Sequence, residues 1–124
     1  MIKEHDFSFE TLNVYQAVRN LVKEIYLAQK HLPKEETYAL GDQIRRAAIS
    51  ISSNLAEGSG RSSYREKIHF IEISYGSLME VYSQLQLGVD LNYIKQETFL
   101  ALREDIINIA KMLSGLKASF GKSI

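Results

Sequence analysis

Apolar residues recur at alternating spacings of three and four along most of the chain, which is the pattern of amphipathic α-helices. Short polar stretches divide this pattern into four long segments. We therefore expect helices over about residues 9–30, 37–57, 64–89 and 95–119. Short connections make consecutive helices run antiparallel. The pattern predicts an all-α, up-down-up-down antiparallel four-helix bundle, with residues 1–124 forming one domain.

The third segment carries the clearest seam of apolar residues. Its predicted inward-facing positions are Ile68, Ile71, Tyr75, Leu78, Tyr82, Leu85 and Val89. In the first segment the predicted seam follows Tyr15, Val18, Val22 and Ile25, and a second stripe follows Val14, Leu21 and Ala28. The fourth segment has a similar additional stripe at Leu100 and Ile107. These extra stripes exceed what the interior of one bundle needs, which favours an oligomer.

The second segment has an ordinary apolar side and an unusual side opposite to it. Its core side is predicted to consist of Leu40, Ile44, Ala47, Ala48, Ile51 and Leu55. The opposite side carries small or apolar groups where a solvated helix usually carries Lys and Glu, namely Ile49, Ser52, Ser53 and Ala56. We interpret this side as a candidate oligomer interface. The alternative is a set of scattered exposed apolar residues, which monomers also show.

Three local signals mark the ends of these helices. Pro33 is predicted to close the first helix. Gly58 and Gly60 are predicted to stop the second, because glycine accepts the left-handed conformation common at helix C-termini. Ser63 followed by Glu66 forms a capping box, which predicts that the third helix begins at Tyr64.

Several stretches carry a resemblance to a known family: QIRRAA (43–48), Ser50, NLAEG (54–58) and Arg61, with supporting stretches at 12–18, 75–85 and 111–120. They resemble the signature of the 23S ribosomal RNA intervening-sequence proteins, a family of four-helix bundles that includes accessory proteins of diversity-generating retroelements. The resemblance implies a homopentamer of unknown cellular role. It also implies nucleic acid or a reverse-transcriptase-like protein as candidate partners. Ser52 stands where many members have proline, and this chain is neutral where the retroelement proteins are basic.

Composition narrows the class of protein further. The chain is 45% hydrophobic and 24% charged, which is typical of a folded globule rather than a disordered segment. It contains no cysteine, so disulfides and thiolate metal sites are excluded, and a reducing cytoplasm suits it. No uncharged apolar run approaches the roughly 18 residues of a membrane span. We expect a cytoplasmic protein without a membrane partner.

The net charge is zero, but basic residues concentrate in the middle of the chain. The candidate site for RNA, single-stranded DNA or another anion consists of Arg45, Arg46, Arg61, Arg65 and Lys67. Its alternative is ordinary surface charge with local pairs, such as Asp42 with Arg46 at i,i+4. Arg61 and Arg65 flank the turn between the second and third helices, where helix amides favour an anion. That turn lacks the strand and the Lys-Ser/Thr of a phosphate-binding P-loop.

Metal and catalytic chemistry find little support in the sequence. Glu66 and His69 have the Glu-x-x-His spacing of di-iron bundles, with Glu72 one turn further, but no second such pair exists. His69 is also predicted to point away from the core. We therefore expect no metal, no cofactor and no catalytic residue. The alternative is a small enzyme or anion-binding protein with a site at the turn between the second and third helices.

A polar row borders the predicted core on the second helix. It consists of Gln43, Ser50, Asn54 and Glu57, which must hydrogen-bond to an adjacent helix or subunit at this position. We expect this row to specify helix register and assembly. Taken together, the sequence predicts a non-enzymatic, oligomeric scaffold or interaction module that binds nucleic acid weakly.

Overall fold

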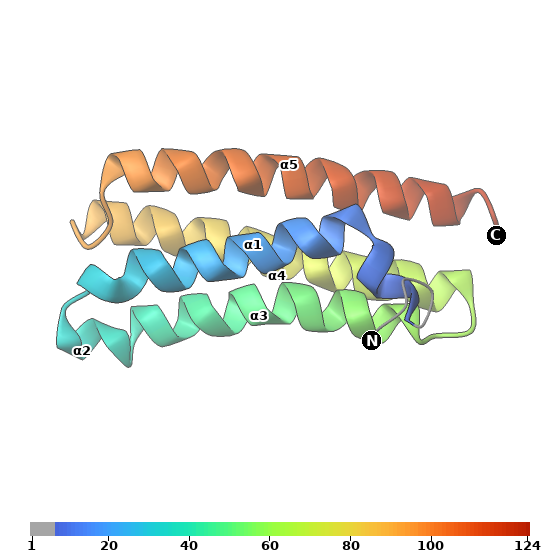
Figure 1. Cartoon of the computed structure of the whole chain (residues 1–124), viewed down its shortest axis with the longest axis horizontal. Helices are drawn as coiled ribbons and strands as arrows, with labels where there is room; N and C mark the ends of the chain where they lie inside the picture. Colours follow the sequence, from blue (N-terminus) through green and yellow to red (C-terminus); the bar gives the residue numbers. More distant parts are fainter. Residues whose placement is uncertain (1–6) are drawn as a thin grey trace.

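The computed structural model describes residues 7–124. Its elements, in chain order, are η1 (Ser8–Thr11), α1 (Asn13–Ala28), η2 (Gln29–His31), α2 (Lys34–Thr37), α3 (Leu40–Ser59), α4 (Tyr64–Asp90) and α5 (Gln96–Gly121). Four of them are long helices, α1, α3, α4 and α5, which lie side by side with alternating direction (Figure 1). The predicted all-α, antiparallel four-helix bundle is therefore confirmed.

The four long helices occupy the corners of a four-sided arrangement. Helix α3 packs against α1 and α4, and α5 packs against α4 and α1. The face formed by α1 and α3 is therefore opposite the face formed by α4 and α5. Buried aliphatic side chains from all four helices fill the interior, including Val18, Ile44, Leu78 and Leu113, each of which is fully buried.

The first helix begins later than the sequence pattern predicts. Residues Ser8–Thr11 form a 3₁₀ turn, Leu12 is extended, and α1 begins at Asn13. The Thr11 hydroxyl donates to the Ser8 carbonyl at 2.9 Å, which is a local bond that competes with helix formation. The Phe9 ring packs edge-on against Tyr15, with 4.9 Å between ring centroids. These contacts fold η1 back over the end of the bundle.

The core positions of α1 and α4 also differ from the predicted seams. In α1, Val14 and Leu21 are buried, while Tyr15 and Val22 are half-buried. In α4, the buried positions are Ile71, Ser74, Leu78, Val81, Leu85 and Gly88. Both patterns keep the 3,4 spacing, so hydrophobic periodicity alone does not distinguish them.

Helix α3 selects the observed face of α4 because it lies against the smaller side chains. Ser74 is fully buried, and its hydroxyl donates to the Ile51 carbonyl of α3 at 3.0 Å. The neighbouring tyrosines turn toward α5 instead. Tyr75 is 38% exposed, and Tyr82 stacks on Phe99 with 5.7 Å between ring centroids.

The glycines at the end of α3 do not adopt the predicted left-handed conformation. No glycine among residues 7–124 has a positive φ, and Gly60 has a φ of −84°. Gly58 lies inside the helix, where it is buried against Phe70 of α4. Its function is close approach between helices rather than a reversal of the chain. The second helix also begins later than predicted, since Ala39 interrupts the backbone and α3 begins at Leu40.

The predicted Ser63 cap of α4 is confirmed, but the Glu66 carboxylate bonds to the Ser63 hydroxyl rather than to its backbone N–H, so the capping box is formed only in part. The Ser63 hydroxyl accepts a hydrogen bond from the Glu66 backbone N–H at 3.2 Å and donates to the Glu66 carboxylate at 3.2 Å. Helix α4 begins at Tyr64 as a result.

Candidate functional site

The five basic residues of the predicted anion site do not form one cluster. Arg45 and Arg46 lie near the first turn of α3, whereas Arg61, Arg65 and Lys67 lie beyond its C-terminal end. Sixteen residues separate Arg45 from Arg61, which corresponds to roughly 24 Å along a helix. A ligand at one end of the bundle therefore contacts two or three of these residues rather than five.

Arg45 is engaged inside the protein. Its guanidinium donates to the Gln29 side-chain oxygen at 2.6 Å and to the Thr37 carbonyl at 2.8 Å, and it lies 3.8 Å from Asp42. These bonds connect η2 and α2 to α3. The adjacent Arg46 points outward, with its side chain 80% exposed, and forms the predicted pair with Asp42 at 2.9 Å.

Arg61 and Arg65 lie at the surface of the α3–α4 turn. Arg61 pairs with Glu57 at 3.1 Å, and its guanidinium lies 4.7 Å from the centre of the Phe70 ring. Cation–π contact and the ion pair together fix the Arg61 side chain along the α3–α4 face. Arg65 is exposed and takes part in none of the ion pairs between described residues. Lys67 points inward instead, donating to the Ser59 carbonyl at 3.0 Å.

Only part of the predicted polar row on α3 bonds to an adjacent helix. Ser50 bonds to Ser77 of α4, with 2.9 Å between the two hydroxyl oxygens. The Asn54 side-chain amide donates to the Ser50 carbonyl at 2.8 Å. Gln43 accepts from Gln84 of α4 at a long 3.5 Å. Glu57, the fourth residue of the row, is exposed and pairs with Arg61 at 3.1 Å. Ser50 is therefore the member of the row that ties α3 to α4 by a short bond.

The candidate oligomer interface on α3 lies on the side of that helix nearest α1. We call it the α3 surface: Ile49, Ser52, Ser53 and Ala56. Ile49 is 43% exposed and lies one turn from Arg45, which bonds to the segment following α1. Ser52 and Ala56 are half-buried, and Ser53 is exposed.

A second apolar surface lies between α4 and α5. We call it the α4–α5 groove: Tyr75, Met79, Tyr82, Ile107 and Ala110. All five line one hollow of about 290 Å³. A neighbouring hollow of about 310 Å³ shares only Tyr75 with it and has Glu72 and Lys117 among its other lining residues. Ile107 belongs to the additional apolar stripe of the fourth helix, so the sequence indicates the α5 side of this groove. It does not indicate the α4 side, because Tyr75 and Tyr82 are predicted to face the core.

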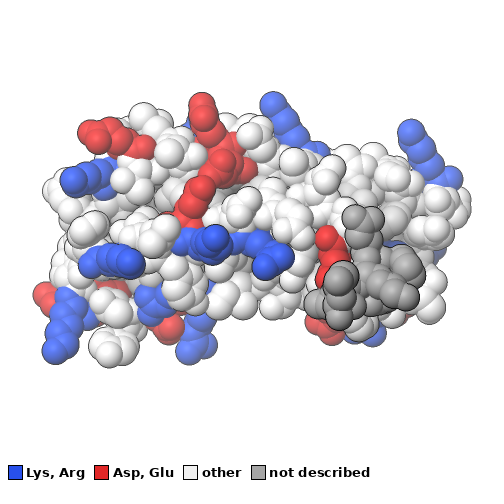
Figure 2. Space-filling model, viewed as in Figure 1, with Lys and Arg blue, Asp and Glu red and all other residues white. Residues whose placement is uncertain are grey.

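Charges of both signs are interspersed over the face shown in Figure 2.

Across the α1–α5 contact, a hydrogen bond between the carboxyl groups of Glu24 and Asp105 raises the pKa of Glu24 to about 7, with burial and charge repulsion adding to the effect. In the loop between α4 and α5, burial and the neighbouring Glu36 carboxylate raise the pKa of Tyr93. His69 is exposed, and within residues 7–124 no three His, Asp or Glu side chains gather as a metal site.

Comparison with known proteins identifies the family. The family model described as 23S rRNA-intervening sequence protein matches residues 10–115. The chain belongs to this family. The matched range includes the α3 surface, the α3–α4 turn and most of α5.

One solved relative of this 23S rRNA-intervening sequence protein supports the fold. It is a protein of unknown function from the S23 ribosomal protein family of Bacteroides thetaiotaomicron, with a TM-score of 0.78 and 24% identity. The alignment covers 85% of this chain and 95% of the other. At this identity the likeness shows the fold alone. No curated protein matches the chain.

Among the described residues, no helix is both long and apolar enough to cross a bilayer.

Proposed function

We propose that this protein is a non-enzymatic module that assembles with copies of itself. The observation that carries the proposal is the pair of apolar surfaces outside the core, the α3 surface and the α4–α5 groove. Met79 is 37% exposed and Tyr75 is 38% exposed in the groove, and Ile49 is 43% exposed on α3. Burying such residues between chains is favourable, at about 25 cal/mol per Å² of apolar surface.

The relative position of the two surfaces favours a ring. The α3 surface belongs to the α1–α3 face of the bundle, and the groove belongs to the opposite α4–α5 face. Contact between two different surfaces is heterologous, and it generates a closed ring when the rotation between neighbours closes. A two-fold dimer would instead pair one surface with itself. Five copies is the number that the family resemblance implies.

Multi-angle light scattering on the purified protein tests this proposal directly. The chain mass is 14.1 kDa, so a homopentamer has a mass of about 70 kDa. A mass that stays at that of one chain at micromolar concentration would contradict self-assembly. A stable dimer would retain self-assembly but contradict the heterologous ring.

A second candidate function is weak binding of RNA or single-stranded DNA at the α3–α4 turn. The specific observation that favours it is the outward position of Arg65 beside Arg61. The basic C-terminus lies at the same end of the bundle, because Tyr64 packs on Phe120 with 5.5 Å between ring centroids, and Lys122 follows closely. A ring would repeat these charges on one rim, and such repetition raises avidity for a long polyanion.

A protein partner, such as a reverse transcriptase, is the competing ligand for the same rim. The two are distinguished by salt dependence, since phosphate contacts release counterions and weaken steeply as salt rises. An enzyme with a site at this turn is the remaining alternative. It requires a turnover assay with a small anionic substrate, in which loss of activity on Arg61→Ala would support catalysis over binding.

A further inference from the structure

Lys67 occupies a position on α4 where the bundle core would otherwise continue. The buried positions of α4 follow the 3,4 spacing from Gly88 back to Ile71. The next position in this series toward the N-terminus is Lys67. Its side chain is half-buried rather than solvated. A charged residue at a core position indicates that the interior at this end of the bundle is packed differently from the interior along the rest of α4.

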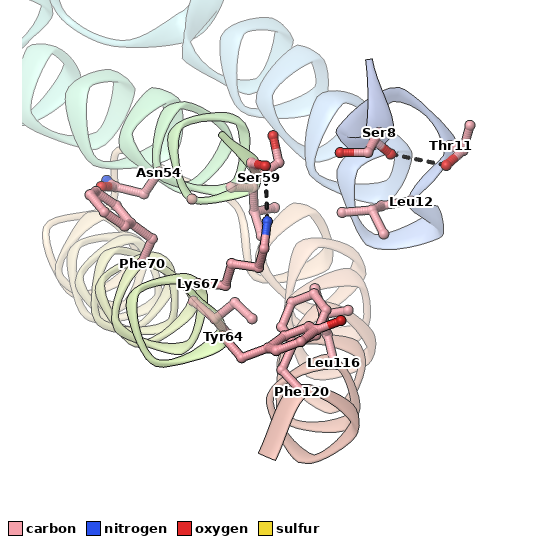
Figure 3. Close-up of a pocket in the computed structure, with 13 residues that line it drawn as sticks. Ser8, Thr11, Leu12, Asn54, Ser59, Tyr64, Lys67, Phe70, Leu116 and Phe120 are labelled. Carbon is pink, nitrogen blue, oxygen red and sulfur yellow. Dashed lines mark hydrogen bonds between the residues drawn. The ribbon is translucent and has the colours of Figure 1, made fainter. Parts of the chain in front are cut away.

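An apolar recess of about 370 Å³ lies beside Lys67. It exists because α1 begins only at Asn13 and stops short of this end, where α4 and α5 continue (Figure 1). The short η1 segment closes the missing side with Thr11 and Leu12. The other walls include Tyr64 of α4 with Leu116 and Phe120 of α5 (Figure 3).

The Lys67 ammonium retains hydrogen-bonding capacity toward this recess. Figure 3 shows its side chain rising from α4 to Ser59 in the middle of the lining residues, and the bond to the Ser59 carbonyl is 3.0 Å long. An ammonium has three N–H donors, of which this bond uses one. The ion pairs between described residues do not include Lys67. A partly desolvated cation beside an apolar hollow is complementary to an anion that carries an apolar tail.

We propose that this end recess binds a small amphipathic carboxylate, such as a medium-chain fatty acid. The carboxylate bonds to the Lys67 ammonium, and the alkyl tail packs against Leu12, Leu116 and Phe120. The recess is at the lower end of the roughly 300–1,000 Å³ range of ligand pockets, so the tail is short. The site is independent of self-assembly, because it lies inside one chain and uses neither the α3 surface nor the α4–α5 groove.

A purely structural role for Lys67 is the competing explanation. Lysine side chains near a helix C-terminus commonly bond the last carbonyl groups, as Lys67 does with Ser59. A purely structural Lys67 would need neither a hollow beside its ammonium nor the capacity to bind an anion there. The two explanations therefore differ in whether the full-length protein takes up a carboxylate.

Isothermal titration calorimetry of the full-length protein with sodium octanoate distinguishes them. We expect saturable binding of one octanoate per chain. Because each buried methylene is favourable, octanoate should bind about fourfold more tightly than heptanoate. Octylammonium should bind at least about tenfold more weakly than octanoate, because its charge repels Lys67. Equal binding of both ions, or heat that does not saturate, would overturn the proposal.

Two variants and one control assign the site. Lys67→Met keeps the length of the side chain but removes the cation, so octanoate binding should fall at least about tenfold while 1-octanol binding is unchanged. Leu116→Phe fills the recess and should abolish binding of both compounds. Lys30→Met removes an exposed cation at the opposite end and should change neither. Circular dichroism verifies folding of each variant. Unchanged octanoate binding in either site variant would exclude the recess.

Discussion

Gly58 and Phe70 hold α3 and α4 together at a separation that no other residue at position 58 permits. A Cβ atom built on Gly58 would lie 2.6 Å from the Phe70 Cβ, well inside van der Waals contact. Both atoms are attached directly to helical backbone, so neither rotates away. We expect Gly58→Ala to force the two helices apart and to lower the free energy of unfolding by about 1–3 kcal/mol, as overpacking does.

Gly115 supplies the matched control for this substitution. It lies inside α5, and a Cβ built there has no heavy atom within 4 Å. Gly115→Ala should therefore raise the free energy of unfolding by roughly 0.5–1 kcal/mol through helix propensity alone. Urea denaturation followed by circular dichroism measures both variants. Effects of the same sign would show that contact with Phe70 does not determine the requirement for glycine at position 58.

Neighbouring arginines on α3 should differ strongly in their contribution to stability. Arg45 has a side chain only 21% exposed and bonds Gln29 and Thr37, whereas Arg46 is 80% exposed and pairs only with Asp42. Arg45→Ala leaves two partly buried acceptors without their donor, so we expect a loss of about 1.5–3 kcal/mol. Arg46→Ala should cost at most about 1 kcal/mol. Thermal unfolding of both variants checks this, and equal losses would contradict it.

The fold was predictable from the sequence because the 3,4 hydrophobic periodicity marks each long helix, and Ser63 marks the start of α4. The face of α4 that becomes the core was not predictable in the same way. Tyr75 and Ser74 both complete a 3,4 pattern with Leu78, and the tyrosine is the more hydrophobic choice. Packing decides for Ser74, because its small side chain lets α3 approach and its hydroxyl finds the Ile51 carbonyl.

The spatial arrangement of the candidate anion-site residues was not predictable from their positions in the sequence. Local charge counts placed Arg45, Arg61 and Lys67 in one basic stretch of sequence. The greater part of α3 separates Arg45 from the other two, and inward bonds remove Arg45 and Lys67 from the outer surface. The end recess left no sequence signal of its own, because it depends on the late start of α1 at Asn13.

The Glu24–Asp105 pair should make stability fall as pH rises. The pKa of Glu24 is raised from 4.5 to about 7 in the folded protein, chiefly by its hydrogen bond with Asp105. Between these values the folded state binds more protons than the unfolded state. The stabilising contribution is therefore complete below pH 4.5 and is lost as pH rises through about 7.

Chemical denaturation across this pH range, compared between wild type and Glu24→Gln, isolates the effect of the pair. The difference in unfolding free energy between the two proteins should change with pH in this window, with wild type losing more on going to high pH. Asp105→Asn should reduce the same dependence, because it removes the carboxyl group that raises the pKa of Glu24. A difference that is constant with pH would show that Asp105 does not raise the pKa of Glu24.

Self-assembly should fail when a charge is placed on either proposed surface. Ile49→Glu on the α3 surface and Met79→Glu in the α4–α5 groove would each bury an unpaired carboxylate between chains, which is costly. We expect both variants to lose the mass of about 70 kDa while keeping a helical circular dichroism spectrum. Leu27→Glu is the control, because Leu27 is 57% exposed on α1 and belongs to neither surface. Unchanged mass in both variants would move the interface elsewhere.

Nucleic-acid binding, if the α3–α4 turn provides it, should be weak per chain and strongly dependent on salt. The chain is neutral overall, so attraction comes from the local charges of Arg61 and Arg65 and from their repetition around a ring. We expect micromolar or weaker binding to a fluorescently labelled single-stranded RNA, falling steeply between about 50 and 200 mM salt as counterions are released. Fluorescence anisotropy at several salt concentrations measures both the affinity and the salt slope.

The variant Arg61→Glu/Arg65→Glu should weaken RNA binding and reduce the salt slope by roughly 1.4 per chain in contact, since each single-strand phosphate contact contributes about 0.7. Its control is Lys30→Glu/Arg46→Glu, which makes the same change in net charge at the opposite end of the bundle. If net charge alone governs binding, both pairs lower the affinity equally. If the turn is the site, only the first pair changes the slope. Should wild type not bind RNA even at about 50 mM salt, where phosphate contacts are strongest, the rim is free for a protein partner.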